Sequence, residues 1–166
     1  EHGLSVHPYL EKYHLSSGDK VLTIEGKEVL NLDELNKGIM FRGARKLRVL
    51  HPNGETENIA LPKEIDRTLF QVGALPAFGL RSNANMVGEV IKDSPAKKAG
   101  LRKNDVLIAV NSDTVQYFDQ LTRGLYYAKG NQCVLTVLRG NDTLKLKTNV
   151  KVDGTIGFQA SGKILV

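Results

Sequence analysis

The alternation of apolar and polar residues predicts short strands separated by turns in the second half of the chain. Four segments rich in branched apolar residues are typical of strands: residues 85–91, 105–111, 133–138 and 143–148. Residues 118–128 instead carry Phe118, Leu121 and Leu125 at helical spacing, so we expect a helix there.

A shorter helix is predicted between the first two of these strands. Ser94 can cap its first turn, Pro95 suits the first helical position, and Gly100 can end it in a left-handed conformation. Residues 139–142 (Arg-Gly-Asn-Asp) are rich in hairpin residues and should join the last two strands.

The first half of the chain shows the same order of elements. The predicted elements are a short helix at residues 8–13, a strand at 20–24, a longer helix at 32–41, and strands at 47–50 and 57–61 around a turn at 52–54. The mixed polarity of residues 62–76 favours an ordered connection over a flexible linker.

The two halves are copies of one another. Asp19 and Asp105 lie 86 positions apart, and at this offset residues 5–41 align with residues 91–127 without a gap. Identical pairs include Lys12 and Lys98, Leu15 and Leu101, Val29 and Val115, Asp33 and Asp119, Leu35 and Leu121, and Gly38 and Gly124. Solenoid repeats have periods of about 20–50 residues, so this repeat is a small domain present twice.

Composition narrows the class of protein. The 166 residues are 41% hydrophobic and 25% charged, and no apolar run reaches the ~18 residues that a membrane helix needs. The net charge of +5 is dispersed among acids and apolar residues, so we expect no nucleic-acid partner. Cys133 lies in a strand-like run and is expected to be a buried thiol. We expect a soluble fragment of a larger protein.

Residues 94–111, with the sequence SPAKKAGLRKNDVLIAVN, resemble a PDZ domain of the bacterial, circularly permuted kind. The family pattern is roughly S-P-A-x-x-A-G-L-x-x-G-D-x-I-x-x-V-N-G, and the resemblance extends through most of residues 78–150. Asn104 and Ser112 replace two glycines of the pattern. Asn tolerates the left-handed region, so the first change is mild.

Residues 9–26 resemble a degenerate copy that keeps Leu15, Gly18-Asp19 and Gly26. Such a tandem pair resembles the periplasmic insert of site-2 proteases, which are membrane-embedded zinc metalloproteases of the regulator of sigma-E protease type. Residues 154–159 (GTIGFQ) also resemble the strand that follows the second PDZ domain in that family.

The predicted fold is α+β, with two PDZ-like domains in tandem. Each should be a small strand-dominated sandwich or partial barrel with one short and one longer helix. We place the divergent first domain at residues 1–64, the connection at 65–76, and the second domain at 77–166.

The resemblance implies that a groove binds the C-terminal or extended peptide of a protein substrate by adding it as a strand. Phe78, Gly79, Leu80 and Arg81 are the candidate carboxylate loop of the second domain. Leu121, Thr122 and Leu125 are the candidate groove wall, although Leu121 and Leu125 could equally be plain core. The first copy has no such strand at the repeat offset, so it is missing or supplied from elsewhere, for example residues 68–71.

The sequence supports neither a metal site nor a catalytic residue in this chain. His7, Glu11 and His14 share one helical face, but the equivalent positions of the second copy, Asp93, Lys97 and Gly100, do not form a ligand set. Their spacing also departs from His-Glu-x-x-His, the motif of zinc proteases, which the chain lacks. Ser16-Ser17 reads as a turn without His and Asp partners.

The leading hypothesis is therefore a non-catalytic tandem PDZ region of a site-2-type metalloprotease. It would gate or recognise substrates for regulated intramembrane proteolysis at the periplasmic face of the bacterial inner membrane. No cofactor is expected in this chain, while the membrane-embedded parent enzyme would carry zinc. The alternatives are a free-standing PDZ scaffold of an envelope or secretion assembly, and the PDZ tail of a trypsin-like serine protease.

Overall fold

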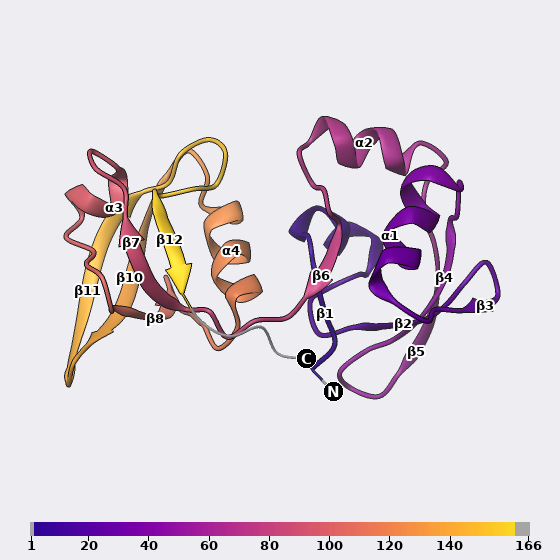
Figure 1. The fold of residues 1–166 in the computed structure, drawn as a ribbon, viewed down its shortest axis with the longest axis horizontal. Coiled ribbons are helices and arrows are strands. Elements are labelled where there is room, and N and C mark those ends of the chain that lie inside the picture. The colour runs from indigo at the N-terminus through magenta and orange to yellow at the C-terminus, as the bar shows by residue number, and fades with distance from the viewer. Residues whose placement is uncertain (1, 162–166) are drawn as a thin grey trace. The chain divides into compact units, whose positions relative to one another are not determined.

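The computed structural model describes residues 2–161, which form two compact units that divide after Arg81 (Figure 1). We call residues 2–81 unit 1 and residues 82–161 unit 2. The division lies later than the predicted boundaries, because the expected connection at residues 65–76 is part of unit 1. It forms helix α2 (Ile65–Gln71), whose Ile65 and Leu69 are fully buried in the unit 1 core. Residues 1 and 162–166 of the predicted domains lie outside the described residues.

Unit 1 contains nine short elements. In chain order they are β1 (Leu4–Val6), the 3₁₀ helix η1 (Pro8–Tyr13), β2 (Lys20–Ile24), β3 (Lys27–Glu28), α1 (Leu32–Phe41), β4 (Lys46–Leu50), β5 (Thr56–Ala60), α2 (Ile65–Gln71) and β6 (Phe78–Leu80). Strands β3, β2, β4 and β5 form an antiparallel sheet in that order, while β1 pairs with β6. The predicted helices at 8–13 and 32–41 and the strand at 20–24 are confirmed.

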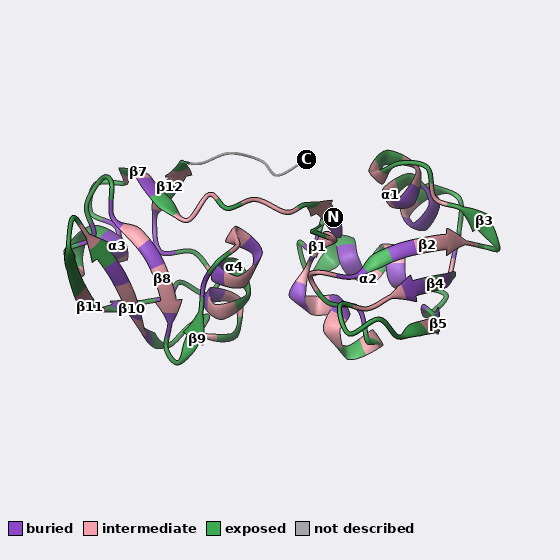
Figure 2. Ribbon diagram, turned by 90° about the horizontal axis from the view of Figure 1, so that it is seen from below, coloured by how far each residue is buried: buried purple, intermediate pink, exposed green. Residues whose placement is uncertain are grey.

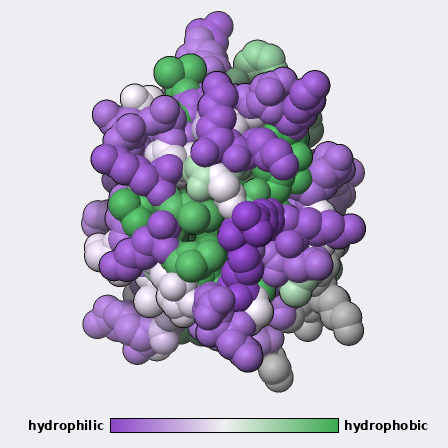
Figure 3. Space-filling view, turned by 90° about the vertical axis from the view of Figure 1, so that its left-hand side faces the viewer, coloured by the Kyte–Doolittle hydropathy of each residue, from purple (hydrophilic) through white to green (hydrophobic). Residues whose placement is uncertain are grey.

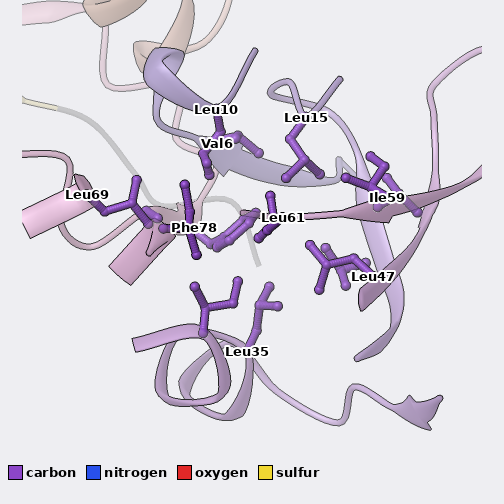
Figure 4. Packing of buried hydrophobic residues seen from close by; sticks show 14 of the residues in the cluster. Val6, Leu10, Leu15, Leu35, Leu47, Ile59, Leu61, Leu69 and Phe78 are labelled. Carbon is purple, nitrogen blue, oxygen red and sulfur yellow. The ribbon is translucent and has the colours of Figure 1, made fainter. Parts of the chain in front are cut away.

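The core of unit 1 gathers side chains from nearly every element of the unit. Leu10, Leu35 and Leu69 are 0% exposed, and they come from three different helices. Phe78 of β6 lies among them and is 1% exposed (Figure 4). Burying one such side chain is worth about 1.5–3 kcal/mol, so β6 is an integral strand of this unit.

Unit 2 repeats the architecture. Its elements are β7 (Met86–Val90), α3 (Pro95–Lys98), β8 (Val106–Val110), β9 (Asp113–Thr114), α4 (Phe118–Tyr127), β10 (Gln132–Arg139), β11 (Asp142–Asn149) and β12 (Phe158–Ser161). The main strands follow the order β11-β10-β8-β7-β12, and β9 pairs with β8. The strands, helices and hairpin predicted for this half are confirmed within a few residues.

The short helix α3 is stabilised at both ends as the sequence predicts. The Ser94 hydroxyl accepts a hydrogen bond from the Lys97 N–H at 3.1 Å, Pro95 begins the helix, and Gly100 follows with φ +87°. Asn104 stands where the family pattern has a glycine. It adopts φ +70°, so the left-handed conformation expected at this position is kept.

Each longer helix packs one face on its own sheet and exposes the other (Figure 2). Gly124 allows this contact in unit 2, because a Cβ there would lie 2.8 Å from Cβ of Val110 on β8. The equivalent Gly38 faces the tip of Ile24, with 2.6 Å between an added Cβ and Cδ1. The repeated glycine therefore leaves room for the strand side chain that packs against the helix in each unit.

The aspartates that reveal the repeat are both 0% exposed and play the same structural part. Asp19 accepts the Ser16 N–H at 2.8 Å, and Asp105 accepts the Arg102 N–H at 2.9 Å, so each holds the turn that enters a strand. Their cationic partners differ. Arg139 donates two hydrogen bonds of 2.8 Å to Asp105, whereas Asp19 is paired with His51.

The face of unit 2 that carries β11 and α3 is largely hydrophilic, with smaller apolar patches between the polar side chains (Figure 3). Lys145 and Lys147 of β11 are exposed. No helix among residues 2–161 has the length and apolar character required to cross a membrane.

Candidate functional site

The candidate site is a cavity in unit 2 with a volume of about 270 Å³, bordered by helix α4, the loop before β12, and β12 itself. Its lining residues are Ile91, Phe118, Leu121, Thr122, Leu125, Lys151, Gly154, Thr155, Ile156, Gly157 and Phe158. The wall is mainly apolar, whereas the loop contributes backbone groups. This combination suits a ligand with an apolar side chain attached to a polar main chain.

The three predicted wall residues lie together on α4. Leu121 is 0% exposed and Leu125 4% exposed, so both belong to the core of unit 2 and also form the floor of the cavity. Thr122 is exposed, and its hydroxyl donates to the Asp119 carbonyl at 3.0 Å. The two interpretations of these leucines, core and pocket, are therefore compatible.

The loop before β12 has a row of carbonyl groups tied to the body of unit 2. The bonds run from Lys151 N–H to Thr155 O at 2.9 Å, from Ala96 N–H to Ile156 O at 2.9 Å, and from Ile91 N–H to Gly157 O at 3.0 Å. In a trans peptide the C=O and the following N–H point in opposite directions. The N–H groups of Ile156, Gly157 and Phe158 therefore point away from these donors, and successive N–H groups of this kind attract anions.

Gly157 is required by the shape of this loop. It adopts φ +88°, and a Cβ at this position would lie 2.4 Å from Cβ of Ser94. The Ser94 hydroxyl, which caps α3, also donates to the Gly157 carbonyl at 3.1 Å. The short helix thus holds the loop in place through one serine.

Strand β12 presents an open edge to α4. It pairs with β7 so that Phe158 lies opposite Val90, and it is the last strand of its sheet among the described residues. Bonded and non-bonded pairs alternate along an antiparallel ladder, and at the neighbouring position the Ile91 N–H donates to the Gly157 carbonyl at 3.0 Å. The N–H and C=O of Phe158 therefore face away from β7, and Figure 1 shows β12 between β7 and α4.

Charges at the site come from the ends of the same loop. The Thr155 hydroxyl and N–H both donate to Asp153 Oδ1, at 2.7 and 2.9 Å, and these bonds lower the pKa of Asp153. Lys151 is exposed and lines the cavity. Asp153 therefore stabilises the conformation of the loop, while the positive charge of Lys151 lies at the cavity, where it would attract an anionic ligand.

The predicted carboxylate loop lies elsewhere than expected. Phe78, Gly79 and Leu80 form β6 of unit 1, where they pair with Val6, Ser5 and Leu4, and Arg81 is the last residue of that unit. The expectation that these residues line the groove of the second domain was wrong in its placement, because the buried Phe78 side chain fixes the strand in the unit 1 core. An added Cβ at Gly79 would contact only Ser5, at 3.8 Å, so the packing around this position does not require a glycine.

The two sets of predicted site residues are thus assigned to different units. In unit 2 the residues that line the cavity beside α4 are instead Ile156, Gly157 and Phe158, which the sequence predicted only as part of a following strand. The available signal was weak, because Phe158 lies 80 positions after Phe78 and therefore outside the repeat offset of 86. The alternative source for the missing strand of the first copy, residues 68–71, was wrong because they lie in α2.

The remaining chemical candidates have structural roles. His7 caps η1, with its Nδ1 accepting the Tyr9 N–H at 3.1 Å, and His14 lies 3.0 Å from Glu57. No cluster of His, Cys, Asp and Glu side chains within residues 2–161 is arranged to hold a metal. Cys133 is 2% exposed, as predicted, and burial raises the pKa of its thiol.

Comparison with protein families finds a PDZ domain at residues 77–150. The matched segment begins at β6 and ends before β12.

Two curated relatives and one solved structure illustrate the similarity. The periplasmic pH-dependent serine endoprotease DegQ of Escherichia coli K12 is 42% identical over 149 residues, covering 81% of this chain and 32% of DegQ. A Clostridium perfringens protein assigned by its name to the zinc metalloproteases is 35% identical over 60 residues, covering 36% of this chain and 18% of that protein. The HtrA-type protease AlgW with a decapeptide has a TM-score of 0.39 and 13% identity, over 64% of this chain and 41% of that one. This chain spans about a third or less of the length of these curated relatives.

Proposed function

We propose that unit 2 is a peptide-binding PDZ domain whose groove captures the free C-terminus of a protein chain. The observation that supports this most strongly is the row of N–H groups at Ile156, Gly157 and Phe158 beside an open strand edge. A terminal carboxylate accepts hydrogen bonds from such a row, while the peptide backbone continues along β12 as an added strand.

The cavity supports a preference for an apolar last residue. A side chain that projects from the bound end would meet Leu121, Leu125 and Ile156, which are nearly fully buried and present no charge. The volume of about 270 Å³ suits one side chain of the size of Val, Leu or Phe. Lys151 at the edge adds attraction for the carboxylate.

Titration of the full chain with heptapeptides tests this function. The probe is a mixture with a free carboxylate and Val, Leu, Phe or Ala at the last position, and the control is the same mixture amidated at its C-terminus. We expect amide-resonance changes at Ile156, Gly157 and Phe158, and an affinity about tenfold lower for the amidated mixture, because charge-assisted hydrogen bonds are lost. Equal affinity for both mixtures would exclude carboxylate capture.

A blocking variant adds a matched control. Thr122→Tyr places a large ring at an exposed position that lines the groove, whereas Thr143→Tyr places the same ring at an exposed position on β11. We expect the first to abolish binding and the second to leave it unchanged. Binding that survives Thr122→Tyr in a folded chain would place the ligand elsewhere.

We further propose that the chain is a non-catalytic segment of a larger envelope protease. The similarity to DegQ over 81% of the chain supports the expected alternative, a PDZ segment of a trypsin-like serine endoprotease, better than the leading hypothesis. By its name DegQ is periplasmic, which supports a periplasmic location for this segment as well. In this setting the groove would recognise protein ends on behalf of a catalytic domain elsewhere in the parent.

The site-2-type metalloprotease is the second candidate parent, and the similarity to the Clostridium perfringens protein favours it. It would carry zinc in its membrane segments, and the present segment would gate substrates on the periplasmic side of the inner membrane. The sequence flanking the segment in its parent decides between the two. A Ser-His-Asp domain upstream supports the first candidate, and His-Glu-x-x-His in an apolar segment supports the second.

A further inference from the structure

In unit 1 a side-chain amide bridges the helix and the strand that correspond to the groove of unit 2. Asn36 of α1 donates from Nδ2 to the Phe78 carbonyl at 3.0 Å, and its Oδ1 accepts the Phe78 N–H at 3.3 Å. Nδ2 also donates to the Leu32 carbonyl at 3.2 Å, which fixes the side chain against its own helix. A carboxamide has the donor and acceptor of a peptide group. Asn36 therefore makes with Phe78 the two bonds that a residue of an added strand would make.

Phe78 holds the same place in unit 1 that Phe158 holds in unit 2. The His7 N–H donates to the Ala77 carbonyl at 2.9 Å, as the Ile91 N–H donates to the Gly157 carbonyl at 3.0 Å. Val6 then pairs with Phe78 as Val90 pairs with Phe158. The N–H and C=O of Phe78 accordingly face away from β1 and toward α1.

The two helices differ, among other positions, at the position of Asn36. Thr122 lies 86 positions after Asn36, at the same place in the repeat. Its hydroxyl donates to the Asp119 carbonyl of its own helix at 3.0 Å and is shorter than the carboxamide. The cavity of unit 2 lies between Thr122 and Phe158, where unit 1 has the Asn36 bridge.

We propose that unit 1 contains a second, related groove, which Asn36 keeps closed by occupying the place of the ligand; the N–H groups of Ala77 and Phe78 match those of Gly157 and Phe158, whereas Pro76, at the place of Ile156, has none. The proposed function of unit 2 supplies the class of ligand, an extended peptide with a free carboxylate. Such a peptide must displace the Asn36 amide from Phe78 before it can bind. Apparent affinity falls in proportion to the fraction of open grooves. Asn36 thus restricts peptide binding to unit 2.

Hydrogen exchange of the full chain tests the closure without any ligand. We expect Asn36→Thr, which copies unit 2, to speed exchange of the Phe78 amide by roughly fivefold or more, since one hydrogen bond is removed. Exchange of the Val49 amide, in the central sheet of unit 1, should stay constant. Unchanged exchange at Phe78 would overturn the proposal.

The reciprocal variant does not depend on the tolerance of unit 1 to substitution. Thr122→Asn should slow exchange of the Phe158 amide and weaken binding of the heptapeptide mixture to unit 2 by about tenfold. If Asn36→Thr also accelerates exchange at Val49, the substitution has destabilised unit 1 as a whole. Thr122→Asn then tests whether an asparagine at this position closes the groove. A folded Thr122→Asn chain with unchanged exchange and affinity would contradict the proposal.

Binding of the heptapeptide mixture gives the final comparison. We expect it to perturb amides of β12 and α4 in the wild-type chain, and those of β6 and α1 as well in Asn36→Thr. If the peptides perturb amides of β6 in the wild-type chain with the same affinity as those of β12, the proposed closure of unit 1 is wrong. A wild type without perturbation at β12 would refute the proposed function, and the exchange rates of Phe78 would still decide the role of Asn36.

Discussion

The imidazole Nδ1 of His51 lies 2.9 Å from Oδ1 of Asp19, a carboxylate that is 0% exposed. The equivalent carboxylate of unit 2, Asp105, is bonded to Arg139. An arginine is charged at every accessible pH, whereas a histidine titrates near neutrality. The two copies therefore share one buried acid but respond differently to pH.

Unit 1 is expected to lose stability as the pH rises above neutrality. The hydrogen bond to Asp19 raises the pKa of His51 above its ordinary value of 6.5, although burial opposes the shift, and Glu57 at 3.2 Å adds to it. The stabilisation that protonated His51 gives unit 1 is complete below pH 6.5, and it is lost as the pH rises through the higher pKa of His51 in the folded state. Hydrogen exchange of the Val49 amide at several pH values measures it.

The His51→Gln variant is the control for this pH dependence. It should remove the dependence above pH 6.5 and destabilise unit 1 by about 1 kcal/mol or more at pH 6, because a charged hydrogen bond to Asp19 is lost. The Glu57 carboxylate also stabilises unit 1, but with the opposite pH dependence. Bonds to His14 and then His51 lower the pKa of Glu57, so its stabilisation is lost as the pH falls below 4.5. A stability of unit 1 that is flat from pH 6 to 9 would contradict the assignment to His51.

Replacing Arg139 by Met is expected to destabilise unit 2 by about 3 kcal/mol or more, because it leaves the buried Asp105 without its cation. Burial alone would raise the pKa of Asp105, but the bonds from Arg139 and the Arg102 N–H outweigh burial and hold it below its ordinary value. Chemical denaturation measures the loss, and Lys145→Met on exposed β11 serves as the control. A loss no larger than that of the control would show that Asp105 tolerates burial without its partner.

Gly157→Ala should damage both stability and binding in unit 2. The new Cβ would lie 2.4 Å from Cβ of Ser94, and the residue would keep φ +88°. Gly140→Ala is the matched control, since Gly140 also has a positive φ of +59° but no atom within 4 Å of an added Cβ. We expect Gly157→Ala to cost about 1–3 kcal/mol more in denaturation. Equal costs would indicate that the loop can shift away from Ser94.

Gly124→Ala is expected to destabilise unit 2 although alanine favours helices. The added methyl would lie 2.8 Å from Val110 Cβ, which is fixed on β8, and such overpacking costs about 1–3 kcal/mol. The matched change Gly38→Ala in unit 1 meets Cδ1 of Ile24, the movable end of a flexible side chain, and should cost less. In a double-mutant cycle Val110→Ala, which removes Cγ1 and Cγ2 at 2.9 and 3.2 Å from the added methyl, should recover part of the loss. Additive costs of the two changes would argue against the contact.

Much of the fold was predictable because its signals are local. The caps of α3, the helical spacing of Phe118, Leu121 and Leu125, and the hairpin residues between β10 and β11 act within a few positions of one another. Because the two halves align, the elements predicted in the second half could also be predicted at the matching positions of the first. The part of the site that lies on α4 was predictable for the same reason.

The strand that completes each groove was not predictable in this way, since strands can pair over any distance along the chain. Phe78 and Phe158 lie on either side of the strands and helices of unit 2, so chain position alone does not decide which of them belongs to it. Burial of Phe78 among Leu10, Leu35 and Leu69 assigns the first to unit 1. The second then pairs with β7 and completes unit 2.

The sequence by itself determined the duplication, the order of elements and the PDZ resemblance, because each rests on residue identity and periodicity. Only the tertiary structure decided where one unit ends, which strand borders each helix, and that Asn36 bonds Phe78 while Thr122 leaves Phe158 open. These features depend on which side chains share a core and which backbone groups meet across space. Positions far apart in the chain decide both.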